Sequence, residues 1–449
     1  MDTRTPTVAL TKPRYTQGKQ LAERIFFDTM AAIDLRQAML SRLESKRGIL
    51  RAGEVTVPLA RPPRVVAFGK AANGMATALY EVLGGGIETG IIVAPDDPQE
   101  RLNRFRYFVG GHPYPTSGSL QGAEAALQLV SGLSADDVVV FLVSGGGSAL
   151  FEKPLDPAVT LSDLVEFNRV LVTCGLPIEQ INVLRKHISA VKGGRLARSA
   201  YPAHQLTVFV SDVPPRFNSM VASGPTMPDD STLEQCYALA LECNLLPRFP
   251  PSIQKQFEQA TLKETPKPGD SKFHNSSYFC LLSNREAVEA ARVAAEKHGF
   301  LAEIDSGDWD AGYQQVVRSN LAALDALAAR HRGEPVCLVA GGEVICPVTG
   351  PGTGGRNQAF VLYAAQQTAG QNRVVLSAGT DGRDGNSPVS GAMADGQTVS
   401  RGRDLQLDSA DYLARSDSFS YFRALNDTVN TGPTDNNVRD VRLWLDYNS

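Results

Sequence analysis

Short apolar runs alternate with longer amphipathic stretches along most of the chain. Several of these runs are four to six residues long and rich in β-branched side chains. Runs this short, separated by helix-like segments, predict buried parallel strands of an α/β fold. The predicted strands are residues 65–68, 138–143, 206–210, 336–340 and 374–378.

The amphipathic stretches predict helices that cover the sheets, because their apolar residues recur at helical spacing. These stretches are residues 19–43, 73–83, 119–132, 161–174, 234–243, 285–298 and 311–331. Residues 244–276 carry several prolines and few strand signals, so we predict a linker there, with the next strand at 278–283 opening a second domain. The predicted domains are residues 1–260 and 270–449.

Composition narrows the functional classes. The 449 residues are 43% hydrophobic and 20% charged, which excludes a disordered chain. The net charge is -4 and the basic residues are scattered, so we expect no nucleic-acid partner and favour small molecules. No apolar run approaches the ~18 residues of a membrane span, and the first residues lack a signal peptide, so we expect no membrane partner and a cytoplasmic location.

The 40 glycines gather where the predicted strands end. That edge of an open α/β sheet is where ligands bind, and glycine lets backbone amides approach an anion closely. The clearest case follows strand 138–143, where a glycine-rich turn could hold a phosphate or could be only a tight turn. We predict nucleotide binding by its residues Ser144, Gly145, Gly146, Gly147 and Ser148.

Three cations accompany these glycines. Lys70 follows strand 65–68 and could reach a phosphoryl group or a carboxylate, although most lysines are simply solvated. Lys192 precedes Gly193 and Gly194 in a basic segment that could equally be a solvated helix face. Arg356 ends the longest glycine-rich string and could neutralise charge on a transferred group.

Three aspartates in glycine-rich or strand-end positions are candidate magnesium ligands. Hard carboxylate oxygens suit this ion, which usually takes one or two protein carboxylates beside phosphate oxygens. Asp212 follows strand 206–210 and could instead cap a turn. Asp381 and Asp384 lie in a loop whose spacing does not match an EF-hand and which could be a plain glycine-rich loop.

Together these features indicate phosphoryl transfer. Anion-binding loops, cations and aspartates occur without a Cys/His metal cluster, a G-x-S-x-G motif or a dinucleotide fingerprint. Hydride transfer is therefore the weaker interpretation.

The order of the motifs resembles that of class II glycerate kinases, the glycerate 2-kinases. TGPTDNNVRD near the end resembles the closing motif of that family's C-terminal MOFRL domain, and the resemblance runs from about residue 15 to 445. The other motifs are GKAANGM, GGHPYPTSGS, LVSGGGSALFEKP, INVLRKHISAVKGGRLA, SDV with ASGPT, GGEV with GTGGRNQ, and AGTDGRDGNSPVSGA.

The resemblance implies two α/β/α domains, with a Rossmann-like N-terminal domain built on a largely parallel sheet and a MOFRL-type C-terminal domain. It implies transfer of the γ-phosphoryl of ATP, with Mg²⁺, to D-glycerate in the cleft between them, usually giving 2-phosphoglycerate. We expect a monomer or homodimer. Lys70 and Arg356 match the family's proposed active-site lysine and arginine. Alternatives are a kinase for a related hydroxy acid, an NAD(P)H-dependent hydroxypyruvate reductase and a non-catalytic relative.

One departure from the family bears on the substrate. After SDV the family usually has a variable residue and then Gly-Asp, whereas Pro214 to Asn218 occupy that turn here. If the family's aspartate holds magnesium or the substrate, this chain must use another carboxylate or bind a different acid. We assign catalysis to Lys70, Arg356 and Asp212, the triphosphate to the 144–148 loop with Lys192 and Gly193–Gly194, and magnesium to Asp212, Asp381 or Asp384.

Overall fold

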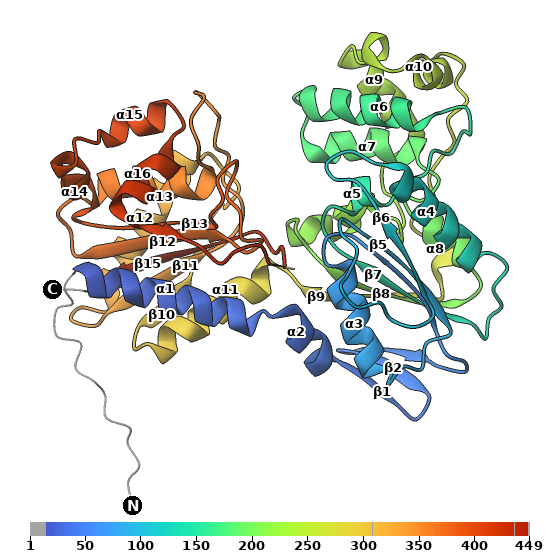
Figure 1. Cartoon of the computed structure of the whole chain (residues 1–449), viewed down its shortest axis with the longest axis horizontal. Helices are drawn as coiled ribbons and strands as arrows, with labels where there is room; N and C mark the ends of the chain where they lie inside the picture. Colours follow the sequence, from blue (N-terminus) through green and yellow to red (C-terminus); the bar gives the residue numbers. More distant parts are fainter. Residues whose placement is uncertain (1–14, 308, 435, 448–449) are drawn as a thin grey trace, which may run out of the picture. The chain divides into compact units, whose positions relative to one another are not determined.

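The computed structural model describes residues 15–307, 309–434 and 436–447, which divide into two compact units (Figure 1). Residues 35–283 form the N-terminal unit, and residues 15–34 join residues 284–447 in the C-terminal unit. The N-terminal unit begins later and ends later than the predicted first domain, residues 1–260. The first helix belongs to the C-terminal unit, and the strand predicted to open the second domain is an edge strand of the first sheet.

The N-terminal unit is built on a parallel six-stranded sheet in the order β6-β5-β4-β7-β8-β9. Its central strand β7 is buried at every position, as its continuous apolar run predicts. The predicted α/β class and three predicted strands are confirmed. The strands are β4 (Arg64–Phe68), β5 (Thr89–Ala94), β6 (Phe105–Val109), β7 (Val138–Val143), β8 (His204–Val210) and β9 (Ser276–Leu282).

Helices of the N-terminal unit fall into two groups. In one group α2 (Leu35–Arg42), α3 (Ala72–Val82) and α4 (Ser117–Val130) pack on the sheet, α5 (Gly147–Leu150) contacts residues Pro215–Ser223, and α8 (Arg195–Ala200) contacts α4. The other group has its own apolar core and consists of α6 (Leu161–Thr173), α7 (Ile178–Ile188), α9 (Leu233–Glu242) and α10 (Pro251–Glu258). Three 3₁₀ helices are η1 (Pro215–Ser223), η2 (Leu246–Arg248) and η3 (Ser271–Phe273).

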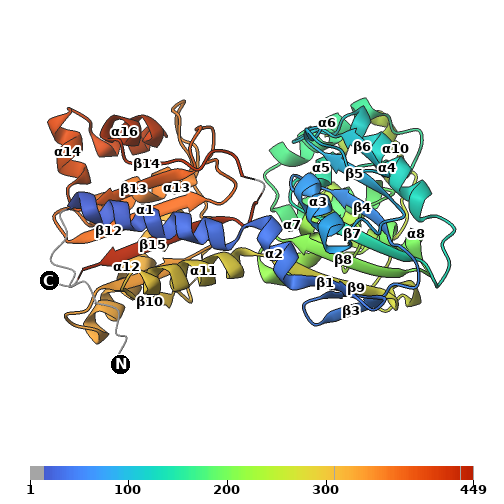
Figure 2. The same cartoon turned by 60° about the horizontal axis from the view of Figure 1, so that its bottom comes forward.

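A small antiparallel sheet flanks the main one. It consists of β1 (Leu43–Lys46), β2 (Ile49–Ala52) and β3 (Val55–Pro58). Its last strand contacts β8 and β9 (Figure 2). The segment predicted as one long helix, residues 19–43, instead forms two helices, Tyr15–Ala32 and Leu35–Arg42, and the first of these strands begins at its last residue, Leu43.

The C-terminal unit contains a mixed sheet in the order β10-β11-β15-β12-β13-β14. β11 and β12 were predicted as parallel strands; they run in the same direction, but β15 lies between them and pairs antiparallel with both. The strands are β10 (Leu301–Ile304), β11 (Val336–Ala340), β12 (Arg373–Gly379), β13 (Gly391–Asp395), β14 (Thr428–Val429) and β15 (Asp440–Asp446).

Helices cover both faces of this sheet. α1 (Tyr15–Ala32) and α11 (Asn284–Lys297) lie on one face, and α12 (Tyr313–Arg330) and α13 (Arg356–Gln367) lie on the other (Figure 1). Three further helices are α14 (Thr398–Asp404), α15 (Ser409–Ala414) and α16 (Ser418–Leu425). Within the described ranges, no helix combines the length and apolar character needed to cross a bilayer.

A buried ion cluster holds α1 on the C-terminal unit. Lys19 Nζ lies 2.5 Å from Asp427 Oδ1 and 3.5 Å from Asp395 Oδ2. Arg401 donates to the other oxygen of Asp427 at 2.7 Å. One position before Lys19, a Cβ on Gly18 would lie 2.8 Å from Val374 Cγ2, so the helix approaches β12 closely. Paired buried charges and close packing thus fix the first helix to the last third of the chain.

Asp384 caps the start of α13. Its two carboxylate oxygens accept the backbone N–H groups of Asn357 and Gln358 at 3.0 and 2.9 Å, and the side-chain amides of the same residues bond to it as well. A Cβ on Gly355 would lie 2.3 Å from Asp384 Oδ1, so glycine is required for this approach. A carboxylate is favourable at a helix N-terminus. Both oxygens are therefore engaged, which differs from the predicted role of Asp384 as a metal ligand.

Asp384 should give the C-terminal unit a distinctive pH dependence. Burial raises the pKa of Asp384 to about 6, although the N–H donors favour the charged form. The folded protein then holds an extra proton between about pH 4 and 6, so this carboxyl's contribution to stability is full below pH 4 and declines as the pH rises through 6. The stability of wild type relative to Asp384→Asn should fall by roughly 1–3 kcal/mol from pH 4 to 7.

Urea unfolding followed by tryptophan fluorescence measures this difference, because both tryptophans, Trp309 and Trp444, belong to the C-terminal unit. Asp404→Asn is the matched control, since Asp404 is exposed on the same unit. A difference that stays constant from pH 4 to 7 would show that Asp384 titrates like an ordinary aspartate.

Candidate active site

Two strand ends meet in the N-terminal unit and bring the first candidate residues together. β4 and β7 are parallel neighbours, and their last residues, Phe68 and Val143, are paired. The backbone N–H of Lys70 donates to Gly145 O at 2.9 Å, and Ala71 N–H donates to Ser144 Oγ at 3.0 Å. The loop after β4 is thus bonded directly to the 144–148 loop after β7, as the glycine pattern predicts for adjacent strand ends.

Missing side chains allow this close approach. Gly69 has a φ of +118°, and a Cβ there would lie 2.3 Å from Ser144 Oγ. A Cβ on Gly146 would lie 3.1 Å from Lys70 Cγ and 3.2 Å from His112 Cδ2. The exposed Lys70 side chain and the His112 ring therefore lie directly over the backbone of Gly146.

Asp212 approaches the same loop from β8. A Cβ on Gly145 would lie 2.3 Å from Asp212 Oδ2, so the carboxylate rests on the backbone of that glycine. Within the described part of the chain, the N–H groups of Gly145 and Gly146 donate to no protein acceptor. A cation, a carboxylate and two available amides thus surround one loop, and this donor set fits an anionic group that arrives with a divalent cation.

Sequence reasoning missed His112. It lies in the loop after β6, two strands from β4 in the sheet. It belongs to the GGHPYPTSGS motif, but it received no role in the sequence analysis. Partial burial lowers the pKa of His112, and the charge of Lys70 lowers it further. The imidazole is therefore neutral at pH 7 and can both accept and donate a hydrogen bond.

A hydroxyl chain positions Ser148 at the far end of the loop. Ser148 Oγ lies 2.8 Å from Ser223 Oγ, which donates to Asn182 Oδ1 at 2.9 Å. Ala222 and Ser223 both have positive φ angles, 53° and 62°, which cost energy outside glycine. Such strain is concentrated at functional sites. Ser223 and Asn182 were not predicted, because nothing in sequence spacing indicates the contact.

Lys192, Gly193 and Gly194 occupy a different environment from the predicted one. Lys192 is fully buried, with its ammonium against the carboxylate of Glu152 and 3.3 Å from Phe151 O. Burial lowers the pKa of Lys192, and Glu152 opposes the shift. The N–H groups of Gly193 and Gly194 donate to Ser223 O and Gly224 O at 3.1 and 2.7 Å. These three residues brace the strained turn from inside and do not fit the predicted contact with a triphosphate.

The altered turn after Asp212 keeps a polar contact with β8. Ser211 Oγ donates to Asn218 Oδ1 at 3.0 Å and to Val213 O at 3.1 Å. A neutral amide therefore closes the turn whose acidic residue is missing relative to the family.

Arg356 is the corresponding cation of the C-terminal unit. Its Nε and Nη2 donate to the two oxygens of Asp440 at 2.6 and 2.8 Å, and Nη2 also donates to Glu343 Oε1 at 3.0 Å. Burial would lower the pKa of Arg356, but Asp440 and Glu343 raise it well above its usual range. The guanidinium is permanently charged and 30% exposed, so it can still meet a ligand.

Asp381 lies beside this pair. It is partly exposed, and its Oδ1 accepts Arg383 N–H at 3.1 Å, which closes a turn. A Cβ on Gly379 would lie 3.1 Å from Asp381 Oδ1 and 3.4 Å from Asp440 Oδ1, so both carboxylates face the end of β12. Among the residues that the structure describes, no cluster of three or more His, Cys, Asp or Glu is arranged to hold a metal. Magnesium bound here would depend on one or two carboxylates and on phosphate oxygens.

Two protein families match the sequence. A domain of unknown function, DUF4147, matches residues 21–258, and the MOFRL family matches residues 336–440. Each match falls largely within one of the two units.

Known proteins resemble the chain over most of its length. D-glycerate 2-kinase of Thermotoga maritima is 35% identical over 401 residues, which cover 88% of this chain and 94% of the relative. A putative hydroxypyruvate reductase of Agrobacterium vitis is 34% identical over 435 residues, with 95% and 94% covered. A crystal structure of glycerate kinase from Thermotoga maritima superposes with a TM-score of 0.83 at 32% identity, covering 96% of this chain and 99% of that one.

These similarities confirm the resemblance seen in the ordered motifs. They extend through both units and include the fold as well as the sequence. The chain belongs to the glycerate kinase family whose C-terminal domain is of the MOFRL type.

Proposed function

We propose that this protein transfers the γ-phosphoryl group of ATP to D-glycerate and forms 2-phosphoglycerate. The observation that carries the proposal is the Lys70 side chain packed against Gly146, in a loop whose Gly145 and Gly146 N–H groups donate to no acceptor among the described residues. A lysine and two amides are a suitable receptor for a carboxylate or a phosphate. The relatives named glycerate kinase support the choice of acceptor.

In this proposal some residues bind the substrate and others neutralise charge. Lys70 and the amides of the 144–148 loop, which the sequence analysis assigned to the triphosphate, here bind the glycerate carboxylate, and Ser148 orients the acceptor. Arg356 neutralises charge on the transferred group. Phosphoryl transfer requires mainly such positioning and electrostatic stabilisation. The proposal requires that Lys70 and Arg356 act in the same reaction.

Magnesium, when bound, would neutralise the β- and γ-phosphate oxygens. Asp212 and Asp381 remain the proposed ligands, because their carboxylates lie at strand ends and Asp384 is engaged with α13. We propose Asp212 or the neutral His112 as the acceptor of the proton of the substrate hydroxyl.

Phosphorus NMR of the protein with ATP, Mg²⁺ and D-glycerate tests the function directly. A new phosphomonoester signal coupled to the C2 proton identifies 2-phosphoglycerate, and coupling to the C3 protons identifies the 3-isomer. If no product forms from glycerate, four- and five-carbon sugar acids test the altered Pro214 to Asn218 turn. Oxidation of NADPH by hydroxypyruvate, without any phosphorylated product, would favour the reductase alternative that one relative's name suggests.

Lys70→Ala should abolish most activity without unfolding the protein. Its side chain is exposed and its backbone N–H keeps the bond to Gly145, so only the charge over the loop is lost. We expect kcat/KM to fall on the order of 10²-fold or more, with the melting temperature unchanged. Lys46→Ala is the matched control, because that side chain is 70% exposed on β1. Turnover close to wild type in Lys70→Ala would refute the assignment.

Arg356→Ala is a less specific test. It would leave Asp440, which has no exposed surface, without its bidentate partner, so we expect lost stability as well as lost activity. Arg356→Lys keeps a charge near Asp440 and separates the two effects, since lysine cannot make the bidentate contact.

Asp212→Asn and Asp381→Asn should raise the magnesium concentration needed for half-maximal activity, because each removes one carboxylate from a site with few ligands. Asp384→Asn should leave that concentration unchanged, since its oxygens bond to α13. Steady-state rates titrated with Mg²⁺ measure the effect. If Asp212→Asn instead lowers kcat equally at every magnesium concentration and alters the pH profile, Asp212 is the proton acceptor and not a metal ligand.

A further inference from the structure

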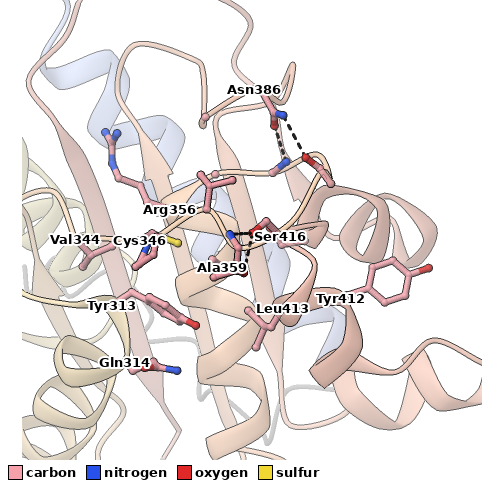
Figure 3. Close-up of a pocket in the computed structure, with 18 residues that line it drawn as sticks. Tyr313, Gln314, Val344, Cys346, Arg356, Ala359, Asn386, Tyr412, Leu413 and Ser416 are labelled. Atoms are coloured by element: carbon pink, nitrogen blue, oxygen red, sulfur yellow. Dashed lines mark hydrogen bonds between the residues drawn. The ribbon is translucent and has the colours of Figure 1, made fainter. Parts of the chain in front are cut away.

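A pocket of about 540 Å³ opens in the C-terminal unit beside Arg356 and the glycine-rich loop before α13 (Figure 3). It lies wholly within this unit, since all its lining residues come from residues 313–418. The proposed function assigns it no role, apart from Arg356 at its edge. Its volume falls in the range of sites that bind drug-sized molecules, and a three-carbon acid would fill only a small part of it.

The two ends of the pocket differ in chemistry. Tyr313, Gln314 and Leu413 lie on one side in Figure 3, and Arg356 and Asn386 lie on the other. Of the residues that line the pocket, only Arg356 carries a charge. One end therefore offers an aromatic ring, an aliphatic side chain and an amide, and the opposite end offers a cation.

The cation retains donor capacity. Nε and Nη2 of Arg356 are engaged by Asp440 and Glu343, whereas Nη1 donates to no acceptor in the described ranges. Val348, which also lines the pocket, has 84% of its surface exposed, so a bound ligand would cover apolar surface that solvent now contacts. A ligand with a flat apolar part, polar edges and an anionic end would satisfy both features.

We propose that this pocket binds the nucleoside part of the phosphoryl donor, with the phosphates directed toward Arg356. A purine base would contact Tyr313 and Leu413 and bond through its edge to Gln314, and the ribose would lie near Ser416 and Ser418. The proposal rests on the function proposed above and specifies where the donor, and not the acceptor acid, is recognised.

Two substitutions change the pocket in opposite ways. Ala359→Leu adds bulk from α13 into the space, and Tyr313→Ala removes the aromatic ring. Tyr363→Ala is the matched control, because Tyr363 forms the edge-to-face ring pair with Tyr313 at 5.8 Å but does not line the pocket. Both alanine variants lose the same ring pair, so any difference between them reports on the pocket.

Displacement of a fluorescent ATP analogue, measured at equilibrium without D-glycerate, gives the affinities. We expect Ala359→Leu and Tyr313→Ala to weaken ATP binding roughly tenfold, since a base–aromatic contact contributes about that much, and Tyr363→Ala to change it less than about twofold. KM for D-glycerate should stay within about twofold of wild type in all three variants. Adenosine should displace the analogue from wild type and about tenfold less well from Ala359→Leu.

The proposal is overturned if ATP affinity is unchanged in the two pocket variants, or if tripolyphosphate displaces the analogue while adenosine does not. Thermal melting verifies that each variant is folded, and if one is not, the other decides. This result is independent of the product assay. If the wild type forms phosphoglycerate but the pocket variants bind ATP with normal affinity, the proposed function is retained and the proposed nucleoside site is wrong. If adenosine binds in this pocket but no phosphorylated product forms, the nucleoside site is retained and the proposed function is wrong.

Discussion

The C-terminal unit depends on how it accommodates one buried carboxylate, that of Asp440. An uncompensated charge in the interior costs several kcal/mol, so this group must be surrounded by partners. Arg356 supplies a bidentate contact, and the fully buried Arg442 lies 3.9 Å away while it donates to the carbonyls of Gly341 and Gly342. This network connects the end of β11, the start of β15 and the first residue of α13, and the place of Arg356 follows from it.

The same constraint explains where interpretation of the sequence was limited. Strands and their glycine-rich ends could be predicted because short β-branched runs and glycines are local signals, and Lys70 became a candidate for that reason. Lys192 also stands beside glycines in a segment with several basic residues, yet it is paired with Glu152, 40 residues earlier. Sequence spacing does not distinguish a cation whose partner is a distant buried carboxylate from one that awaits a ligand.

Other features depend on contacts between distant segments. The 440–446 strand inserts between two strands that its own composition does not identify as neighbours, and His112 reaches Gly146 from a loop two strands away. Asp384 looked like a metal ligand because aspartates between glycines resemble one, but its partners are the first amides of a helix that begins 28 residues earlier. In each case the sequence shows the type of residue or strand but does not show which distant segment it contacts.

The attachment of α1 affects how the chain emerges during synthesis. Helix α1 is made first, but the partners of Lys19, Asp395 and Asp427, are made near the end. Residues 35–283 come between α1 and the rest of its unit, and at ribosomal rates their synthesis takes roughly 12–50 s. The N-terminal unit can therefore complete its sheet while the apolar face of α1 is still uncovered, because the rest of the C-terminal unit has not been made. The C-terminal unit begins first in synthesis and completes its fold last.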